Sequence, residues 1–318
     1  MFDALTGART LHFASSAIVA GIVLFRFLIA GPAFRTANAG ALADAQAYRS
    51  NLASIVWASL AVAIASGAAW LLLLAADISN QSLAEVLSDG TLALLLTGTQ
   101  FGHVWTARFC LAAILSLWLL LPDKGNAHRG NLVPCLLAAL FIGSLAWSGH
   151  AGGTPGSAGD IHRTCDFLHL VAAAAWLGSL PPLAILLQLG RRRANQTLAT
   201  VARTATLRFS MLGTISVGTL LATGIVNTWV LVGDLEALVG TAYGRLLLVK
   251  IGLFVAMVGI AAINRFRLFG MLPNANAARH LQRNALVEFS VGLIIIAIVG
   301  VLGTLPPGVH EEMHLHQH

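Results

Sequence analysis

Long uninterrupted apolar stretches constrain the fold of this chain more than any other feature. Eight of them can be recognised in the 318 residues, and a helix needs about 20 mostly apolar residues to cross the hydrocarbon core of a bilayer. The predicted membrane helices span residues 10–30, 52–76, 103–121, 131–148, 164–190, 208–232, 244–264 and 285–304. Because they occupy most of the chain, they leave no room for a separate soluble domain.

The composition supports the same class of protein. Hydrophobic residues make up 57% of the chain and charged residues only 10%, whereas soluble domains average about 25% charged residues. A transmembrane β-barrel would show short strands of alternating hydrophobicity, and runs such as Leu71–Leu74 and Leu293–Ile298 do not alternate. We therefore expect an all-α polytopic membrane protein, a single bundle of eight transmembrane helices over residues 1–318 in a lipid bilayer.

Lysine and arginine are concentrated in the connections that follow the first, third, fifth and seventh predicted helices. These connections hold thirteen such residues, whereas the N-terminus and the opposite connections hold three, Arg9, Arg163 and Arg245. Positive charges in short loops face the cytoplasm, so this distribution places both termini on the outer side. Membrane orientation explains the net charge of +6, and we expect no nucleic-acid partner.

Histidines gather at the predicted outer ends of the helices. Nine of the eleven lie there, namely His12, His103, His150, His162, His169, His310, His314, His316 and His318. Imidazole is the commonest protein ligand for metal ions. A one-sided group of this size therefore indicates a membrane protein that handles metal at one face, and we expect neither catalytic residues nor enzyme activity.

The most specific local pattern is His162, Asp166 and His169. On a helix these spacings of four and three residues place the side chains on one face. Two imidazoles and a carboxylate suit Cu(II), Zn(II) or Ni(II), although the carboxylate can instead orient an imidazole that binds the metal. The remaining alternative is that these polar side chains only solvate the start of the helix.

Other histidines add candidate ligands at the same face. His150 ends the fourth predicted helix, His12 lies near the start of the first, and His103 opens the third. The tail of residues 305–318 is rich in histidine, and His314, His316 and His318 would share one side of an extended chain. Such tracts bind metal ions, so we count the tail among the candidate metal sites.

Polar residues within the helices have two interpretations. Arg108 and Lys250 lie deep enough to be functional, although either side chain can also extend to the membrane surface. Thr223 and Asn227 lie on one predicted helix with Ser216 and Thr219, and packing against a neighbouring helix is the favoured role for this group.

Four sequence strings resemble the copper resistance D (CopD) family of bacterial inner-membrane proteins. They are WSGHAG at 147–152, DFLHLVAAAAWLGSL at 166–180, ATGIVNTW at 222–229 and YGRLLLVKIGLFVAMVGIAAINRFRL at 243–268. The resemblance implies an eight-helix protein that takes copper from a small periplasmic copper-binding carrier protein and moves it inward. It also implies that His150, Asp166 and His169 occupy the polar motif positions of the family.

Two further functions compete with copper transport. Bundled helices with inward imidazoles can hold b-type haem, and His12, His103, His150 and His169 could serve as its ligands. Lys250 or Arg108 would then lie near a haem propionate. Alternatively, the protein is a sensor or scaffold that binds metal outside without moving it.

Overall fold

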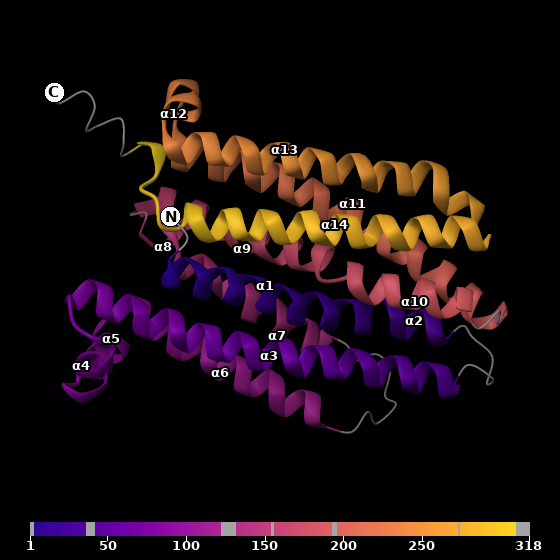
Figure 1. Ribbon diagram of the computed structural model, residues 1–318, viewed down its shortest axis with the longest axis horizontal. Coiled ribbons are helices and arrows are strands. Elements are labelled where there is room, and N and C mark those ends of the chain that lie inside the picture. The colour runs from indigo at the N-terminus through magenta and orange to yellow at the C-terminus, as the bar shows by residue number, and fades with distance from the viewer. Residues whose placement is uncertain are drawn as a thin grey trace.

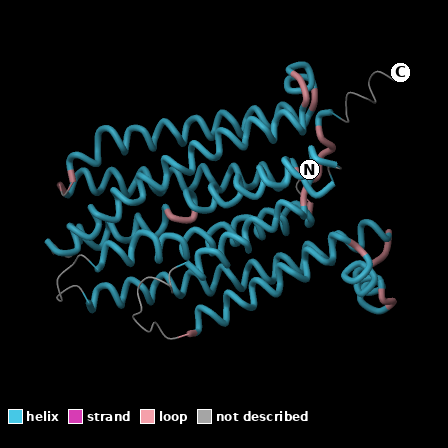
Figure 2. The backbone as a smooth tube through the Cα atoms, turned by 180° about the vertical axis from the view of Figure 1, so that it is seen from behind, coloured by secondary structure: helices cyan, strands magenta, loops and turns pink. Residues whose placement is uncertain are grey.

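The computed structural model describes residues 3–35, 42–121, 132–153, 156–192, 196–272 and 274–309, which are helical almost throughout (Figures 1 and 2). Its long helices are α1 (Ala4–Leu24), α3 (Leu42–Ser79), α6 (Gln100–Leu120), α9 (Gly156–Leu177) continued by α10 (Leu180–Arg192), α11 (Gln196–Val232), α13 (Ala242–Ile263) and α14 (Ala275–Leu302). Among the described residues, seven helical segments are long and apolar enough to cross a membrane. The predicted all-α membrane class is therefore confirmed.

The fourth predicted crossing, at 131–148, corresponds to a shorter segment. It consists of α7 (Leu132–Gly143) and a 3-10 turn, η3 (Ser144–Ser148). The remaining short elements are the π-helical turn η1 (Phe25–Ala30), α2 (Gly31–Arg35), α4 (Leu83–Ser88), α5 (Thr91–Gly98), α8 (His150–Gly153), α12 (Leu235–Gly240), the π-helical turn η4 (Asn264–Leu268) and the 3-10 turn η5 (Phe269–Met271). They lie mainly at the ends of the bundle (Figure 1).

Several helices are longer than their apolar patterns predict. α3, α11 and α14 begin at Leu42, Gln196 and Ala275, about ten residues before the predicted starts. The apolar pattern marks only the part of a helix that lies in hydrocarbon, whereas backbone hydrogen bonding continues beyond it. The added turns carry many of the arginines, so we call this end of the molecule the basic end.

The fifth predicted helix, at 164–190, differs most from the structure. The chain is already helical from Gly156, and it breaks at Gly178–Ser179 between α9 and α10, well inside the bundle (Figure 2). Pro181 and Pro182 follow at once. Proline has no N–H to donate, and its ring clashes with the carbonyl four residues earlier, so a continuous helix cannot form here.

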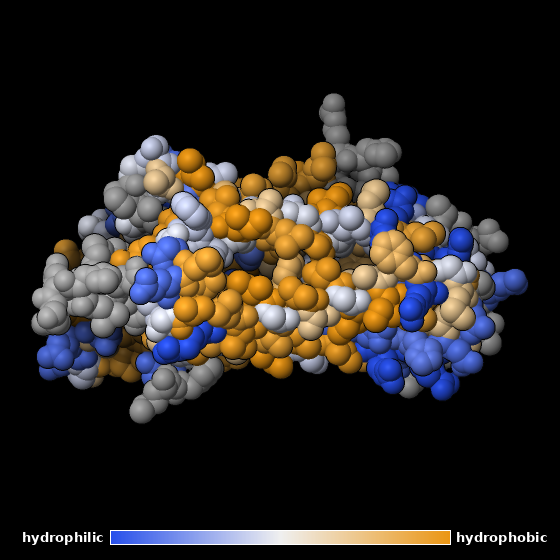
Figure 3. All heavy atoms as spheres, turned by 90° about the horizontal axis from the view of Figure 1, so that it is seen from above, coloured by the Kyte–Doolittle hydropathy of each residue, from blue (hydrophilic) through white to orange (hydrophobic). Residues whose placement is uncertain are grey.

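Helix α1 occupies the centre of the bundle. In its most apolar stretch 72% of residues are buried, compared with 11% in α13, and it packs against α3, α7, α9 and α14. The other helices surround it and expose large apolar side chains such as Ile225 and Val255. These side chains form an apolar belt between two polar ends (Figure 3), as a surface in contact with lipid requires.

Both ends of the described chain lie at one end of the bundle. The N-terminus lies there with α4, α5, α8 and α12 (Figure 1), and the Arg9 guanidinium of α1 lies against Gly303 at the end of α14. This terminal end is opposite the basic end. The placement of the termini on one side agrees with the expectation, and the assignment of that side to the periplasm stays a prediction. His314, His316 and His318 lie outside the described residues.

A close backbone contact joins α1 to α9. A Cβ atom added at Gly21 would lie 2.3 Å from the carbonyl oxygen of Ala174 and 2.4 Å from the Cα of Gly178. The Ser179 hydroxyl donates a hydrogen bond of 3.3 Å to the carbonyl of Gly21. Small residues allow two membrane helices to approach until their backbones touch, and this contact fixes the position of α9 against the central helix.

Substitution of Gly21 by alanine tests this contact. Because the added methyl group would meet backbone atoms that cannot move aside, we expect Gly21→Ala to lower the free energy of unfolding by about 1–3 kcal/mol. The matched control is Gly259→Ala in α13, where an added Cβ meets nothing within 4 Å. Thermal unfolding in detergent measures both variants, and equal melting temperatures would contradict the proposed role of the contact.

Candidate metal centre

Three helices bring polar side chains together in the half of the bundle near the terminal end. Asp166 and His169 lie one turn apart on α9, and Thr223 and Asn227 lie one turn apart on α11. Residues three or four apart share one face of a helix. Because α9 and α11 pack extensively against each other, the two polar pairs meet at their interface.

The hydrogen bonds of His169 determine which of its nitrogens is free. Thr223 donates its hydroxyl hydrogen to the carbonyl of Thr219 at 2.7 Å, so its oxygen is an acceptor for the Nδ1–H of His169 at 2.9 Å. In the neutral imidazole the proton therefore lies on Nδ1. Its Nε2 atom keeps a lone pair, which is the state that a metal ligand requires.

Asp166 and Asn227 supply oxygen donors beside this imidazole. The side-chain amide of Asn227 donates to Asp166 Oδ1 at 3.3 Å, which leaves the Asn227 carbonyl oxygen buried without a hydrogen-bond partner. Buried polar atoms are rarely left unpaired. The arrangement thus presents one imidazole nitrogen, one carboxylate and one unpaired amide oxygen from two helices.

Lys250 of α13 adds a positive charge to this centre. It interacts electrostatically with both Asp166 and His169. An ammonium group near a carboxylate in a site of low dielectric compensates the negative charge. Lys250 therefore supplies the positive charge beside Asp166 that a bound cation would also supply.

The structure places the other predicted ligands as follows. His162 is buried one turn before Asp166, and it has an interaction within the protein. His103 is exposed, and its Nε2–H donates to the carbonyl of Thr97 at 2.9 Å. His150 begins α8, but its side chain lies outside the described part of the structure. Within that part, no three His, Cys, Asp or Glu side chains form a group that could hold a metal ion.

His12 belongs to a separate polar cluster between α1, α3, α6 and α7. The guanidinium of the fully buried Arg108 donates to His12 Nε2 at 2.7 Å and to the carbonyl of Phe141 at 2.8 Å. Since arginine cannot accept a hydrogen bond, His12 Nε2 is the acceptor, and His12 Nδ1–H donates to the carbonyl of Ala63 at 2.8 Å. Both imidazole nitrogens are occupied, so His12 has no lone pair for copper or haem iron.

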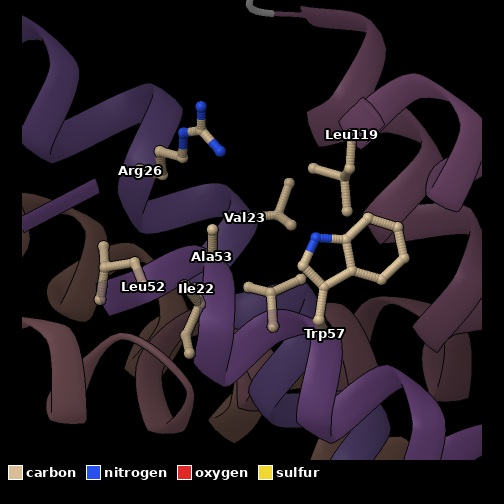
Figure 4. Close-up of a pocket in the computed structure, with 8 residues that line it drawn as sticks. Ile22, Val23, Arg26, Leu52, Ala53, Trp57 and Leu119 are labelled. Carbon is tan, nitrogen blue, oxygen red and sulfur yellow. The ribbon is translucent and has the colours of Figure 1, made fainter. Parts of the chain in front are cut away.

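The small cavity beside Arg26 is not a metal site (Figure 4). It has a volume of about 20 Å³ between α1, α3 and α6, which is room for a single water molecule. Its lining consists of Ile22, Val23, Arg26, Leu52, Ala53, Val56, Trp57 and Leu119. None of these side chains is a usual metal ligand.

The sequence singled out Asp166 and His169 as candidate ligands but did not connect them with Thr223, Asn227 and Lys250. It assigned Thr223 and Asn227 to helix packing, and it left Lys250 between two interpretations. The available signal was their spacing, because Thr223 and Asn227 lie one turn apart on the same helical face. That signal identifies a shared face, but only the packing of α11 and α13 shows that the face meets α9.

Comparison with protein families covers both halves of the chain. Residues 1–160 match the model of the copper resistance protein D-like N-terminal domain, and residues 203–302 match that of copper resistance protein D. The second region includes Thr223, Asn227 and Lys250 of the metal centre. Asp166 and His169 lie between the two matched regions.

The alignments with individual relatives also include the region between the two family matches. The chain is 29% identical to copper resistance protein D of Pseudomonas syringae pv. tomato, over 69% of this chain and 73% of the relative. It is 35% identical to inner membrane protein YebZ of Escherichia coli K12, over 66% and 70% of the two chains. It is also 30% identical to copper transport protein CutJ of Bacillus subtilis 168, over 65% of this chain but only 37% of that protein. From the two family matches and the extent of these similarities, we conclude that the chain belongs to the copper resistance protein D family.

Proposed function

We propose that this protein moves copper ions across the cytoplasmic membrane through a site built on Asp166 and His169. The observation that carries the proposal is the hydrogen bond from His169 Nδ1 to Thr223, which leaves Nε2 available one helical turn from Asp166, where the Asn227 oxygen is unpaired. Membership of a copper resistance family and the similarity to a copper transport protein support copper as the ion.

The donor atoms indicate which form of copper the centre accepts. Imidazole nitrogen and carboxylate or amide oxygen suit Cu(II), whereas thiolate and thioether donors select Cu(I). The residues assigned to the centre include no cysteine or methionine, and the nearest cysteine along α9 is Cys165, one turn before His169. His150, His162, His103 and the histidines of the tail are proposed as auxiliary ligands that collect the ion outside.

The proposed cycle begins at the terminal end of the bundle, which the distribution of basic residues assigns to the periplasm. A small periplasmic copper-binding carrier protein delivers the ion by ligand exchange, and the ion displaces the Lys250 ammonium from the field of Asp166. It then passes toward the basic end between α9, α11 and α13. No step of this cycle requires a catalytic residue.

Copper binding should depend on His169 and on the hydrogen bond that orients it. We expect His169→Ala to abolish stoichiometric copper in the purified protein, and Thr223→Val to weaken copper affinity by roughly 10- to 100-fold, as loss of an orienting partner does. Elemental analysis with an absorption spectrum measures copper and detects any haem. His280→Ala is the control, because that imidazole is exposed at the basic end and is not among the proposed ligands. Full copper content in His169→Ala, or a haem band lost with it, would refute the proposal.

His12 should behave in the opposite way from His169. His12→Ala removes the acceptor of the Arg108 guanidinium, and an unpaired buried donor costs about 1–3 kcal/mol or more when it is charged. We therefore expect a lower melting temperature with unchanged copper content at the Asp166–His169 centre. Loss of copper without loss of stability would instead make His12 a ligand.

Lys250 should compete with copper for Asp166. We expect Lys250→Met to tighten copper binding by roughly tenfold, or about 1.4 kcal/mol, because the ion no longer has to displace an ammonium group. The variant should also unfold more readily without copper, since Asp166 loses its compensating charge. Equilibrium competition with a copper chelator measures the affinity, and weaker binding would identify Lys250 as a supporting residue instead of a competitor.

A further inference from the structure

A second buried acid lies on α14, in the half of the bundle near the basic end. Glu288 of α14 is 2% exposed. Its carboxylate accepts hydrogen bonds from the Asn264 amide at 2.8 Å and from the Trp176 indole. Asn264 is held in turn, because its side-chain oxygen accepts from Asn284 at 2.7 Å. The acid is therefore oriented by neutral donors and has no ion-pair partner among the described residues.

Glu288 lines a cavity of about 260 Å³ bounded by α9, α10, α11, α13, η4, η5 and α14. This volume has room for several water molecules. Most of the lining is apolar, and the polar lining residues are Thr206, Ser210, Thr214, Asn264, Arg265 and Glu288. Glu288 and Arg265 are the two ionisable residues among them, and Arg265 donates to Ser210 Oγ at 2.5 Å and Thr214 Oγ1 at 3.0 Å on the opposite wall.

The cavity and the metal centre share three helices. Trp176, which donates to Glu288, lies seven residues after His169 on α9, two turns on the same face and about 10 Å along the axis. On α11, the buried Ser216 lies seven residues before Thr223, again on the same face. Lys250 lies on α13, and Asn264, which lines the cavity, follows it fourteen residues later at the start of η4. One internal surface thus runs from the metal centre to Glu288.

The chemistry of the cavity suits a proton better than copper. Its lining contains no histidine, cysteine or methionine, so it lacks the donors that hold copper. An acid inside a membrane is costly and commonly belongs to a proton relay. A single carboxyl beside a water-sized space can release its proton to water as hydronium and recover it from hydronium in the reverse step.

We infer that Glu288 is a proton-binding site that exchanges protons through this cavity and is linked to copper passage. The linkage rests on the proposed function, since it requires copper at the Asp166–His169 centre. A copper ion that enters the shared internal surface repels a proton on Glu288, and a protonated Glu288 disfavours the ion by the same amount. Copper binding therefore promotes release of the proton into the cavity.

Few other charged groups lie near enough to disturb this linkage. The residues that α10 contributes to the cavity lining, such as Leu183 and Leu187, are apolar. Arg191 of α10 does not line the cavity, and its guanidinium donates to the side-chain oxygen of Gln282 at 2.7 Å. From α1, which also packs on α14, Arg9 lies far along the helix against Gly303. The groups that face Glu288 are therefore Asn264, Trp176 and, across the cavity, Arg265.

The first test is an infrared pH titration of the carboxyl band in purified protein, with and without copper. We expect a titrating carboxyl in the wild type that is missing in Glu288→Gln and that shifts to lower pH when copper binds. Glu236→Gln makes the same change at an exposed acid and should leave the band intact. His169→Ala should keep the titration but lose the shift. If the titrating band persists in Glu288→Gln, the proton site is overturned. If the midpoint of its titration does not change when copper binds, the linkage is overturned.

The second test is copper uptake into proteoliposomes. We expect Glu288→Gln to bind copper normally while uptake falls by roughly tenfold, within the usual range of coupling between sites, and loses its pH dependence. Gly213→Leu should slow uptake by filling the cavity, whereas Gly218→Leu lies outside the lining and should not. Neither glycine has an atom within 4 Å of an added Cβ. Unchanged uptake and pH dependence in Glu288→Gln would overturn the inference.

These measurements separate the two proposals. If the wild type binds no copper, the proposed function fails, while the titration without copper still decides whether Glu288 binds a proton. If copper binds and depends on His169 but Glu288→Gln behaves as the wild type, the metal centre stands and the proton linkage fails. Normal copper binding by Glu288→Gln also shows that the variant is folded.

Discussion

The need to satisfy polar groups inside the bilayer governs this structure. No water is available in the hydrocarbon core, so each polar group must find a partner within the protein. Arg108 meets this requirement with a backbone carbonyl, a serine hydroxyl and His12, and Glu288 meets it with an amide and an indole. Several buried polar atoms of the described residues lack such a partner, and the Asn227 oxygen beside Asp166 is one of them. Because this oxygen lies beside a carboxylate, it supports the proposed cation site.

The close contact of α1 with α9 makes the polar surface possible. Gly21 and Gly178 allow the central helix to touch α9 through backbone atoms, while α11 packs along another side of α9. The break at Gly178–Ser179 then redirects the chain into α10, so the wall next to Glu288 is apolar. One helix thereby presents Asp166 and His169 to the proposed metal centre and Trp176 to the cavity.

His12 and His169 show that the role of a histidine depends on its second nitrogen. In both, Nδ1–H donates to an oxygen acceptor, the carbonyl of Ala63 or the hydroxyl of Thr223. The difference lies at Nε2, which accepts from Arg108 in His12 and keeps its lone pair in His169. The sequence places His12 and His169 at the same side of the membrane, but they differ in whether a nitrogen lone pair is available to a metal ion.

The sequence by itself determined the all-α membrane class, the approximate crossings and the pairing of Asp166 with His169, because hydrophobic length and helical periodicity are local properties. It also pointed to the copper family through strings around these residues. It did not determine the break after α9, the burial of His12 against Arg108, or the union of Thr223, Asn227 and Lys250 with Asp166. Those features depend on which helix faces meet, and residues more than fifty positions apart are brought together only when the tertiary structure forms.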